Sequence, residues 1–380
     1  MADDMDANER IERMVALKDA DRIGIGPQIF YDAARVAGVT IKQFFNDIDV
    51  AIAAEEKAWQ VYGQPDMAPC GSLFVPSYTG SFPLMSLFWT DWTLPGVAGY
   101  PEDMVPQFIE KDFMGPGGYD TLIEEGLFRF MRFDKAGLAM YAKHLGMFPK
   151  IIAMMNKFKE RKVPMWGGPG YALGATHTPF EMFMSLRGIQ NMMLDVHRRP
   201  DKIIAASEAT VEGLIAMGET GASMPGGRTI FTGGPSGYAS DFISPKSFEK
   251  LVFPYLKKMV NAFVADGFVP HLHVHNNIVP ILEYFKEFPK GKCVLYIDDR
   301  TDIFKAKEVL AGHMCIMGNI RASTLSLGTP YDVEKVVKDV CLRCKEGSGL
   351  IVAVESADDF KPENVKALVD TCKKYGQYRA

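Results

Sequence analysis

Three histidines at alternate positions are the residues with the clearest potential for chemistry. His271, His273 and His275 lie close together just before Asn276 and Asn277, although the chain of 380 residues holds only seven histidines. In a β-strand, side chains at i, i+2 and i+4 share one face. Imidazole is the commonest protein ligand for zinc, and the end of a strand holds a metal rigidly. The cluster predicts a metal or catalytic site; the alternative is a surface strand whose histidines face water.

Eight strand-like segments, each followed by a helical pattern, must position this cluster. Alternating strands and helices favour a parallel sheet, and eight of them favour a (β/α)8 TIM barrel spanning residues 1–380 as a single domain. Gly24 and Gly26 lack the third glycine of a dinucleotide-binding turn, which disfavours a doubly wound sheet. The expected strands cover residues 22–30, 67–74, 163–168, 229–232, 269–275, 293–298, 314–318 and 350–355.

A long insertion after the second strand, residues 75–133, is rich in aromatic residues and methionine. Connections of this length usually have a function, often as a lid or a binding loop. We expect it to line the active site, with Trp89 and Trp92 walling an apolar or aromatic substrate. For most of the 22 methionines in the chain, packing in an irregular core is the simpler explanation.

The composition excludes several classes of protein. A net charge of −5 without a basic stripe argues against nucleic-acid binding. No apolar run reaches the ~18 residues of a membrane span, and the acidic start does not resemble a signal peptide. Six scattered cysteines favour a reducing cytoplasm, and Cys341 and Cys344 fit one helix face better than a redox or zinc motif. The oligomeric state stays open, with a homodimer as one option.

Polar residues follow several of the expected strands, at the end where barrel enzymes carry their active sites. His273, His275 and one carboxylate, Asp298 or Glu355, would make a three-ligand site with an open position, as in catalytic zinc sites. The alternative for each carboxylate is a charge at a helix N-terminus. His177 and Tyr171 are further candidates for a proton donor, and Asn277 for orienting ligands, with helix capping as its alternative. Gln28, Asn319 and Asp241 complete the expected substrate-binding residues, together with Trp89 and Trp92.

Several short motifs occur in an order that is similar to a known family. They are Glu9-Arg10 with Asp21-Arg22, the segment 241–245 before a long helix, the histidine strand with Asn277, and the segments 302–307, 317–319, 328–330 and 362–365. Together they resemble the uroporphyrinogen decarboxylase superfamily and, within it, the zinc-dependent, corrinoid-linked methyltransferases. The resemblance spans the chain and implies a (β/α)8 barrel.

The resemblance separates two branches. The decarboxylases carry an arginine-rich segment after the first strand, whereas residues 28–35 hold a single arginine here, so we reject that activity. The methyltransferases bind zinc through a His-x-Cys pair and a later cysteine. His273 matches that histidine, His275 replaces the first cysteine, and Glu355-Ser356 occupies the region of the second. Asp298 matches an acidic position after the sixth strand.

These replacements lead to a hypothesis about the reaction. A site of two histidines and a carboxylate is harder and more Lewis acidic than a thiolate site, which suits the oxygen of a methyl donor. We expect demethylation of a small aromatic or apolar methyl ether, with transfer of the methyl group to cob(I)alamin. The sequence lacks an Asp-x-His-x-x-Gly motif, so a partner corrinoid protein would supply the cobalamin. One alternative transfers methyl from a methylated corrinoid to a thiol such as coenzyme M, or to a folate; another is a catalytically silent barrel that docks a corrinoid protein.

Overall fold

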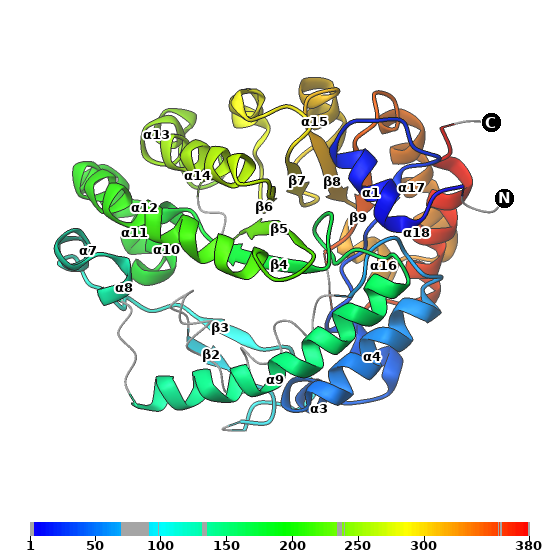
Figure 1. The fold of residues 1–380 in the computed structure, drawn as a ribbon, viewed down its shortest axis with the longest axis horizontal. Coiled ribbons are helices and arrows are strands. Elements are labelled where there is room, and N and C mark those ends of the chain that lie inside the picture. Colours follow the sequence, from blue (N-terminus) through cyan, green and yellow to red (C-terminus); the bar gives the residue numbers. More distant parts are fainter. Residues whose placement is uncertain are drawn as a thin grey trace.

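The computed structural model describes residues 4–69, 91–97, 99–130, 135–233, 238, 240–355, 357 and 359–378. Its main feature is a parallel sheet of seven strands in the order β1-β9-β8-β7-β6-β5-β4 (Figure 1). Every neighbouring pair in this sheet is parallel. The strands are β1 (Gly24–Ile25), β4 (Ala172–Thr176), β5 (Gly227–Thr232), β6 (Val269–Val274), β7 (Val294–Ile297), β8 (Cys315–Asn319) and β9 (Leu350–Ala353).

Short backbone contacts continue the sheet from β1 towards β4. The N–H of Asp66 donates to the carbonyl of Ile25, and the N–H of Ala68 donates to that of Pro164. Ala68 and Met165 form a parallel bridge. These contacts supply the second position of the barrel and the start of the third. The structure is therefore the (β/α)8-type fold that the sequence predicts, with a weakly paired second strand.

The third barrel strand differs from the prediction. Within residues 163–168, Met165 makes the one bridge to Ala68, whereas pairing with β5 comes from Ala172–Thr176, which lies outside the expected strand. Gly167 and Gly170 interrupt the strand because their φ angles are +108° and +100°, a region that favours glycine. The end of this strand is therefore Thr176, not Gly168.

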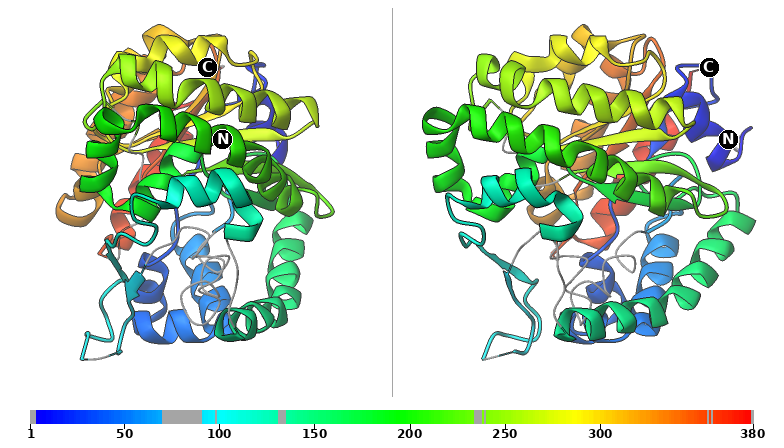
Figure 2. Two further views of the ribbon diagram at one scale, coloured as in Figure 1. Left: turned by 90° about the vertical axis from the view of Figure 1, so that its left-hand side faces the viewer. Right: turned by 60° about the vertical axis from the view of Figure 1, so that its left-hand side comes forward.

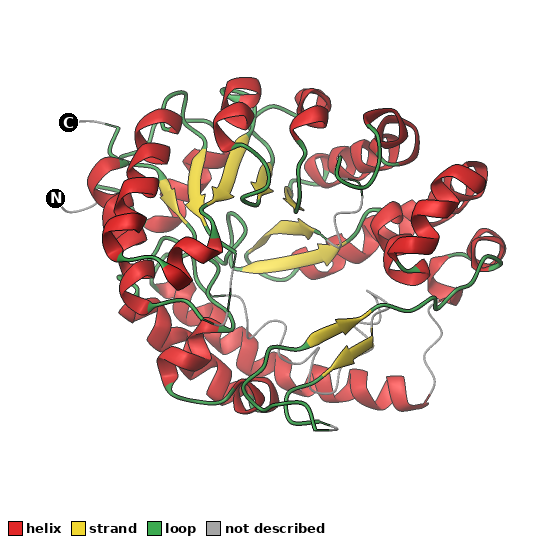
Figure 3. Ribbon diagram, turned by 180° about the vertical axis from the view of Figure 1, so that it is seen from behind, coloured by secondary structure: helices red, strands yellow, loops and turns green. Residues whose placement is uncertain are grey.

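Helices surround the sheet, as the secondary-structure colours of Figure 3 show. Two of them begin at a capping hydroxyl: the side chains of Thr178 and Ser244 each accept a hydrogen bond from a backbone N–H in the first turn. The long helix expected after residues 241–245 is two helices that meet at Val252. The helices are α1 (Ala7–Val15), α2 (Asp32–Ala37), α3 (Ile41–Asn46), α4 (Ile48–Val61), α7 (Gly118–Glu125), α8 (Leu127–Phe130), α9 (Lys135–Glu160), α10 (Pro179–Arg187), α11 (Ile189–Arg198), α12 (Pro200–Ala222), α13 (Pro245–Leu251), α14 (Phe253–Ala265), the 3-10 helix η1 (Val279–Glu287), α15 (Ile303–Leu310), α16 (Ala322–Leu327), α17 (Pro330–Cys344) and α18 (Pro362–Tyr375).

Two apolar cores lie on the two faces of the sheet. Leu272 and Val274 of β6 belong to the large core between the strands and the helices. Val269, on the other face of β6, packs with Trp166 and Tyr296 in a smaller core. This alternation confirms that β6 presents its two sets of side chains to opposite faces, and it directs the histidines inward.

The base of the barrel is closed by α1 and a buried ion-pair network. Arg10 and Arg22 both contact the carboxylate of Asp66, at 2.7 Å and 2.6 Å, and Arg10 also pairs with Asp21 at 2.6 Å. The second oxygen of Asp66 accepts the N–H of Ile25 at 2.9 Å. The network thus joins α1, β1 and the second strand.

The described part of the insertion contains regular secondary structure. It contains an antiparallel ribbon of β2 (Asp91–Thr93) and β3 (Gln107–Ile109). Figure 2 shows α3, α4 and α9 at the opposite end of the molecule from α13 and α15.

Cys341 and Cys344 lie buried in α17, as the helix-face interpretation predicts. In the described ranges, no helix has both the length and the apolarity that crossing a bilayer requires.

Candidate metal centre

The inward face of β6 and the end of β9 bring three potential metal ligands together. His273 Nε2 lies 3.6 Å from Glu355 Oε1, and His275 Nδ1 lies 3.1 Å from Glu355 Oε2. The ligand atoms of the three residues all lie within 4.8 Å of one another. Tetrahedral zinc with bonds of about 2.0–2.2 Å holds its ligand atoms about 3.4 Å apart. The donor types and their spacing therefore fit zinc, with room for a further ligand.

Asp298 supports this triad from the side. Its Oδ2 lies 3.8 Å from His275 Nδ1 and accepts the backbone N–H of Asn276 at 2.8 Å. Its Oδ1 accepts the N–H of Arg300 at 2.9 Å. Because both oxygens hold backbone groups, the geometry suits Asp298 to orienting His275, while Glu355 provides the carboxylate ligand. A residue that fixes a ligating imidazole in this way tunes metal affinity.

The charges of the triad follow from its burial and contacts. Burial lowers the pKa of His273 despite its contact with Glu355. Burial alone would also lower the pKa of His275, but Asp298 and Glu355 outweigh it and raise the pKa to about 10. For Glu355, burial opposes ionisation, and the two imidazoles outweigh it and hold the pKa below its usual range. Without metal, the site therefore holds an imidazolium at His275 beside an ionised Glu355.

Aromatic rings wall the inner side of His273. Tyr296 stacks on the imidazole with ring centroids 4.2 Å apart and an angle of 19°. Phe231 and Trp166 lie at 5.1 Å and 5.7 Å from the same ring. The side chain of His273 is 4% exposed, against 31% for His275 and 37% for Glu355, so the triad opens on one side only. The sequence does not predict this wall, because its three rings come from three strands that lie far apart in the chain.

His177 and Tyr171, the expected proton donors, lie at opposite ends of β4. His177 directly follows Thr176, at the strand end that carries the site, and is buried. Burial lowers its pKa to about 3 despite a hydrogen bond with the Gly233 backbone, so it is neutral at physiological pH. A Cβ added to Gly233 would lie 3.2 Å from that of His273, which places His177 near the triad. Tyr171 precedes β4 and lies near Asp6 and Glu12 of the N-terminal segment, which argues against a role in the site.

The remaining expected site residues mostly fasten loops. Asn277 Oδ1 accepts the N–H of Val279, the first residue of η1, at 3.0 Å, and so holds the start of this helix next to its N-cap residue, Ile278. Asp241 accepts the N–H of Asn277 at 2.9 Å. The N–H of Gln28 donates to the carbonyl of Val354, beside Glu355. Trp89 and the side chain of Trp92 lie outside the described part of the structure.

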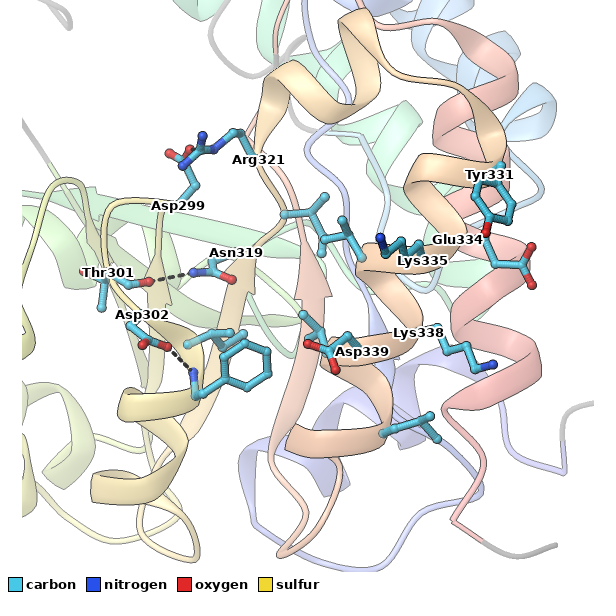
Figure 4. Close-up of a pocket in the computed structure, with 16 residues that line it drawn as sticks. Asp299, Thr301, Asp302, Asn319, Arg321, Tyr331, Glu334, Lys335, Lys338 and Asp339 are labelled. Atoms are coloured by element: carbon cyan, nitrogen blue, oxygen red, sulfur yellow. Dashed lines mark hydrogen bonds and ion pairs between the residues drawn. The ribbon is translucent and has the colours of Figure 1, made fainter.

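Asn319 connects the site to a neighbouring cavity. Its Nδ2 donates to the carbonyls of Thr301 at 2.6 Å and Asp298 at 3.3 Å, which secures the loop that carries Asp298. Figure 4 shows Asn319 between this loop and α17. The same residue lines a cavity of about 850 Å³ outside the barrel, between α15 and α17. Asn319 thus holds the position of Asp298 rather than reaching towards the triad.

Comparisons with known proteins agree with this architecture. The family model described as "Uroporphyrinogen decarboxylase (URO-D)" matches residues 130–375. A methylated-thiol–coenzyme M methyltransferase of Methanosarcina mazei is 21% identical over 230 residues, which cover 60% of this chain and 59% of the relative. A uroporphyrinogen decarboxylase of Geotalea daltonii is 34% identical over 99 residues, which cover 26% of this chain and 27% of the relative.

A solved structure supports the same fold. A methyltransferase from Methanosarcina mazei superposes with a TM-score of 0.68 at 16% sequence identity, covering 98% of this chain and 99% of that one. At this identity the match concerns the fold alone. The family match itself covers more than half of the 380 residues. The chain belongs to the uroporphyrinogen decarboxylase (URO-D) family.

Proposed function

We propose that this chain is a methyltransferase that removes the methyl group of a small aromatic or apolar methyl ether and passes it to cob(I)alamin on a partner corrinoid protein. Methyl transfer is supported by the name of the relative with the longer match. The choice of an ether rests on one observation: the set of His273, His275 and Glu355 consists of two imidazoles and a carboxylate. Asp298, which backs His275, adds a second carboxylate rather than a thiolate.

This ligand set suits an oxygen leaving group. Thiolate ligands place negative charge on a metal, whereas neutral imidazoles leave it more Lewis acidic. Zinc bound by His273, His275 and Glu355 would stabilise the negative charge that develops on the ether oxygen as the carbon–oxygen bond breaks. The distances from Glu355 to His275 Nδ1 and His273 Nε2, 3.1 Å and 3.6 Å, are close to the spacing of about 3.4 Å between two ligand atoms on one zinc ion.

The chain itself has three further tasks, because the nucleophile comes from the partner. It must orient the donor, stabilise the leaving oxygen and exclude water. The rings of Tyr296, Phe231 and Trp166 close the inner side of His273 to bulk solvent. His275 and Glu355 are about one third exposed and face the side from which donor and corrinoid would approach. His177 remains neutral and could donate only an imidazole N–H to the departing oxygen.

The test is methyl transfer from methoxybenzenes to free cob(I)alamin, with methylcobalamin and the phenol both quantified by chromatography. We expect equal amounts of the two products with zinc-loaded protein. Glu355→Gln should abolish the reaction, because it removes the anionic ligand. Glu363→Gln, an exposed position in the first turn of α18, is the matched control and should leave the rate unchanged. Absence of both products from every ether, with zinc bound, would contradict the proposal.

A second candidate is methyl transfer to or from a thiol. It is favoured by the name of the Methanosarcina mazei relative, a methylated-thiol–coenzyme M methyltransferase. Replacing the ether with a methylated thiol, or supplying methylcobalamin with a free thiol, tests it in the same assay. Turnover with these compounds and not with ethers would identify the second candidate. A barrel that binds a corrinoid protein without turnover in either direction would correspond to a docking role.

A further inference from the structure

His271, the third histidine of β6, has no role in the triad and is completely buried. Its Nδ1 is hydrogen-bonded to the carbonyl of Gly167. Since a carbonyl can only accept, this nitrogen carries the proton, and Nε2 of the neutral imidazole presents a lone pair. A Cβ on Gly167 would come within 3.2 Å of His271 Nδ1, so the turn at Gly167 leaves room for this bond.

On the inward face of β6, His271 Nε2 and His273 Nδ1 are both buried and have no hydrogen-bond partner among the described residues. The two rings are neighbours on the inward face of β6, with centroids 5.7 Å apart and an angle of 35°. Buried polar atoms nearly always have a partner, which is often an ordered water. Two such atoms on adjacent rings therefore point to one shared partner.

The surroundings restrict what that partner can be. The rings of Phe231 lie 5.4 Å and 5.1 Å from His271 and His273, and those of Trp166 lie 5.2 Å and 5.7 Å away. Phenylalanine offers no hydrogen-bonding atom, and the indole N–H of Trp166 already donates to the carbonyl of Gly26 at 3.0 Å. Tyr296 also packs against both imidazoles, with ring centroids 6.1 Å and 4.2 Å away, but its hydroxyl bonds neither of these two nitrogens. The arrangement therefore favours a water shared by the two imidazoles.

We propose that His271 is a positioning residue that holds the ring of His273 through one buried water. The inference rests on the proposed metal-ligand role of His273: a metal at its Nε2 requires the proton on Nδ1. The Nδ1–H of His273 would donate to the water, and the water would donate to the lone pair of His271 Nε2. The chain of hydrogen bonds ends at the Gly167 carbonyl, on a different barrel strand. An outer partner of this kind fixes the ring and tautomer of a metal-ligating histidine.

The test combines zinc affinity with a high-resolution crystal structure. His271→Phe keeps an aromatic ring but removes the acceptor, so zinc should bind about 10–100-fold more weakly. His271→Gln restores an acceptor and should recover most of the loss. Glu363→Gln, at an exposed position in the first turn of α18, serves as the control, with affinity unchanged. Thermal unfolding checks that each variant is folded.

The crystal structure of the unmodified chain should show one water within hydrogen-bonding distance of His271 Nε2 and His273 Nδ1. This observation needs neither turnover nor bound zinc, so it separates failure of this proposal from failure of the proposed function. The proposal is overturned if no water bridges the two nitrogens, if His271→Phe binds zinc like the unmodified chain, or if His271→Gln is as weak as His271→Phe. If His271→Phe does not fold, the water and the His271→Gln affinity still decide.

Discussion

Zinc binding to the triad should release about one proton per chain near pH 8. Metal ligands must be deprotonated, so binding expels any proton that they carry. His273 has a lowered pKa and Glu355 is ionised, so neither contributes. His275, whose pKa is raised to about 10, is almost fully protonated at pH 8 and must lose its proton. Competition with one proton makes the apparent Kd fall about tenfold per pH unit up to about pH 9.

Isothermal titration calorimetry measures this release directly. Binding heats in buffers with different ionisation enthalpies give the number of protons released, and a competing chelator keeps the affinity in range. Asp298→Asn is the informative variant, because it leaves all three ligands and removes one of the two carboxylates beside His275. The pKa of His275 should then fall, so fewer protons are released at pH 8. Heats that do not depend on the buffer would refute the account of the site's charges.

The contacts of His275 with Glu355 and Asp298 also make the stability of the metal-free chain depend on pH: higher pH strengthens zinc binding but weakens the fold. A histidine whose pKa is raised in the folded state stabilises the fold fully below its unfolded value of about 6.5. That contribution is lost as the pH rises through about 10. Urea denaturation of the metal-free protein should therefore show a midpoint that falls between pH 7 and 10, and Glu355→Gln should flatten this dependence. An equally steep fall in the variant would point to other groups.

Three further predictions concern the fold. Asp66→Ala leaves two buried arginines without their shared carboxylate and should lower the free energy of unfolding in urea by about 3–5 kcal/mol. Asp49→Ala, at an exposed ion pair, should lower it by less than about 1 kcal/mol. Equal losses in the two variants would contradict the buried network. Thr178→Ala removes the N-cap of α10 and should lower the free energy of unfolding by about 1 kcal/mol; an unchanged midpoint would count against the cap. Gly174→Ala would place a Cβ 1.8 Å from the carbonyl oxygen of Gly218. Thermal unfolding should therefore show that the free energy of unfolding falls by at least the ~1–3 kcal/mol typical of an overpacked site. A variant as stable as the unmodified chain would contradict the close packing of β4 on α12.

The barrel and the histidine face were accessible from sequence because local patterns determine them. Alternation along residues 269–274 places Leu272 and Val274 in the outer core and the histidines opposite, as the structure has them. The break at Gly167 was not predictable in the same way. The segment around it resembles a glycine-rich turn, and only pairing with Gly227–Thr232, about 60 residues later in the chain, identifies Ala172–Thr176 as strand.

Site residues were harder to assign where one residue type serves two purposes. Asn277 and Asp241 follow or precede site elements, yet their oxygens hold backbone N–H groups of the loops. Asp298 and Glu355 are both acidic residues after strands, and their distances from His275 Nδ1, 3.8 Å and 3.1 Å, separate the supporting residue from the ligand. Such distances depend on loop geometry, which a single sequence does not encode in any short pattern.

The central claim is that His273, His275 and Glu355 hold one metal ion, and elemental analysis tests it most directly. The purified chain, supplied with zinc and freed of excess, should retain about one zinc per chain. His273→Ala and Glu355→Ala should each lose it, while Glu363→Gln should keep it. A chain that remains free of zinc after it is supplied, or variants that retain as much as the unmodified protein, would contradict the account.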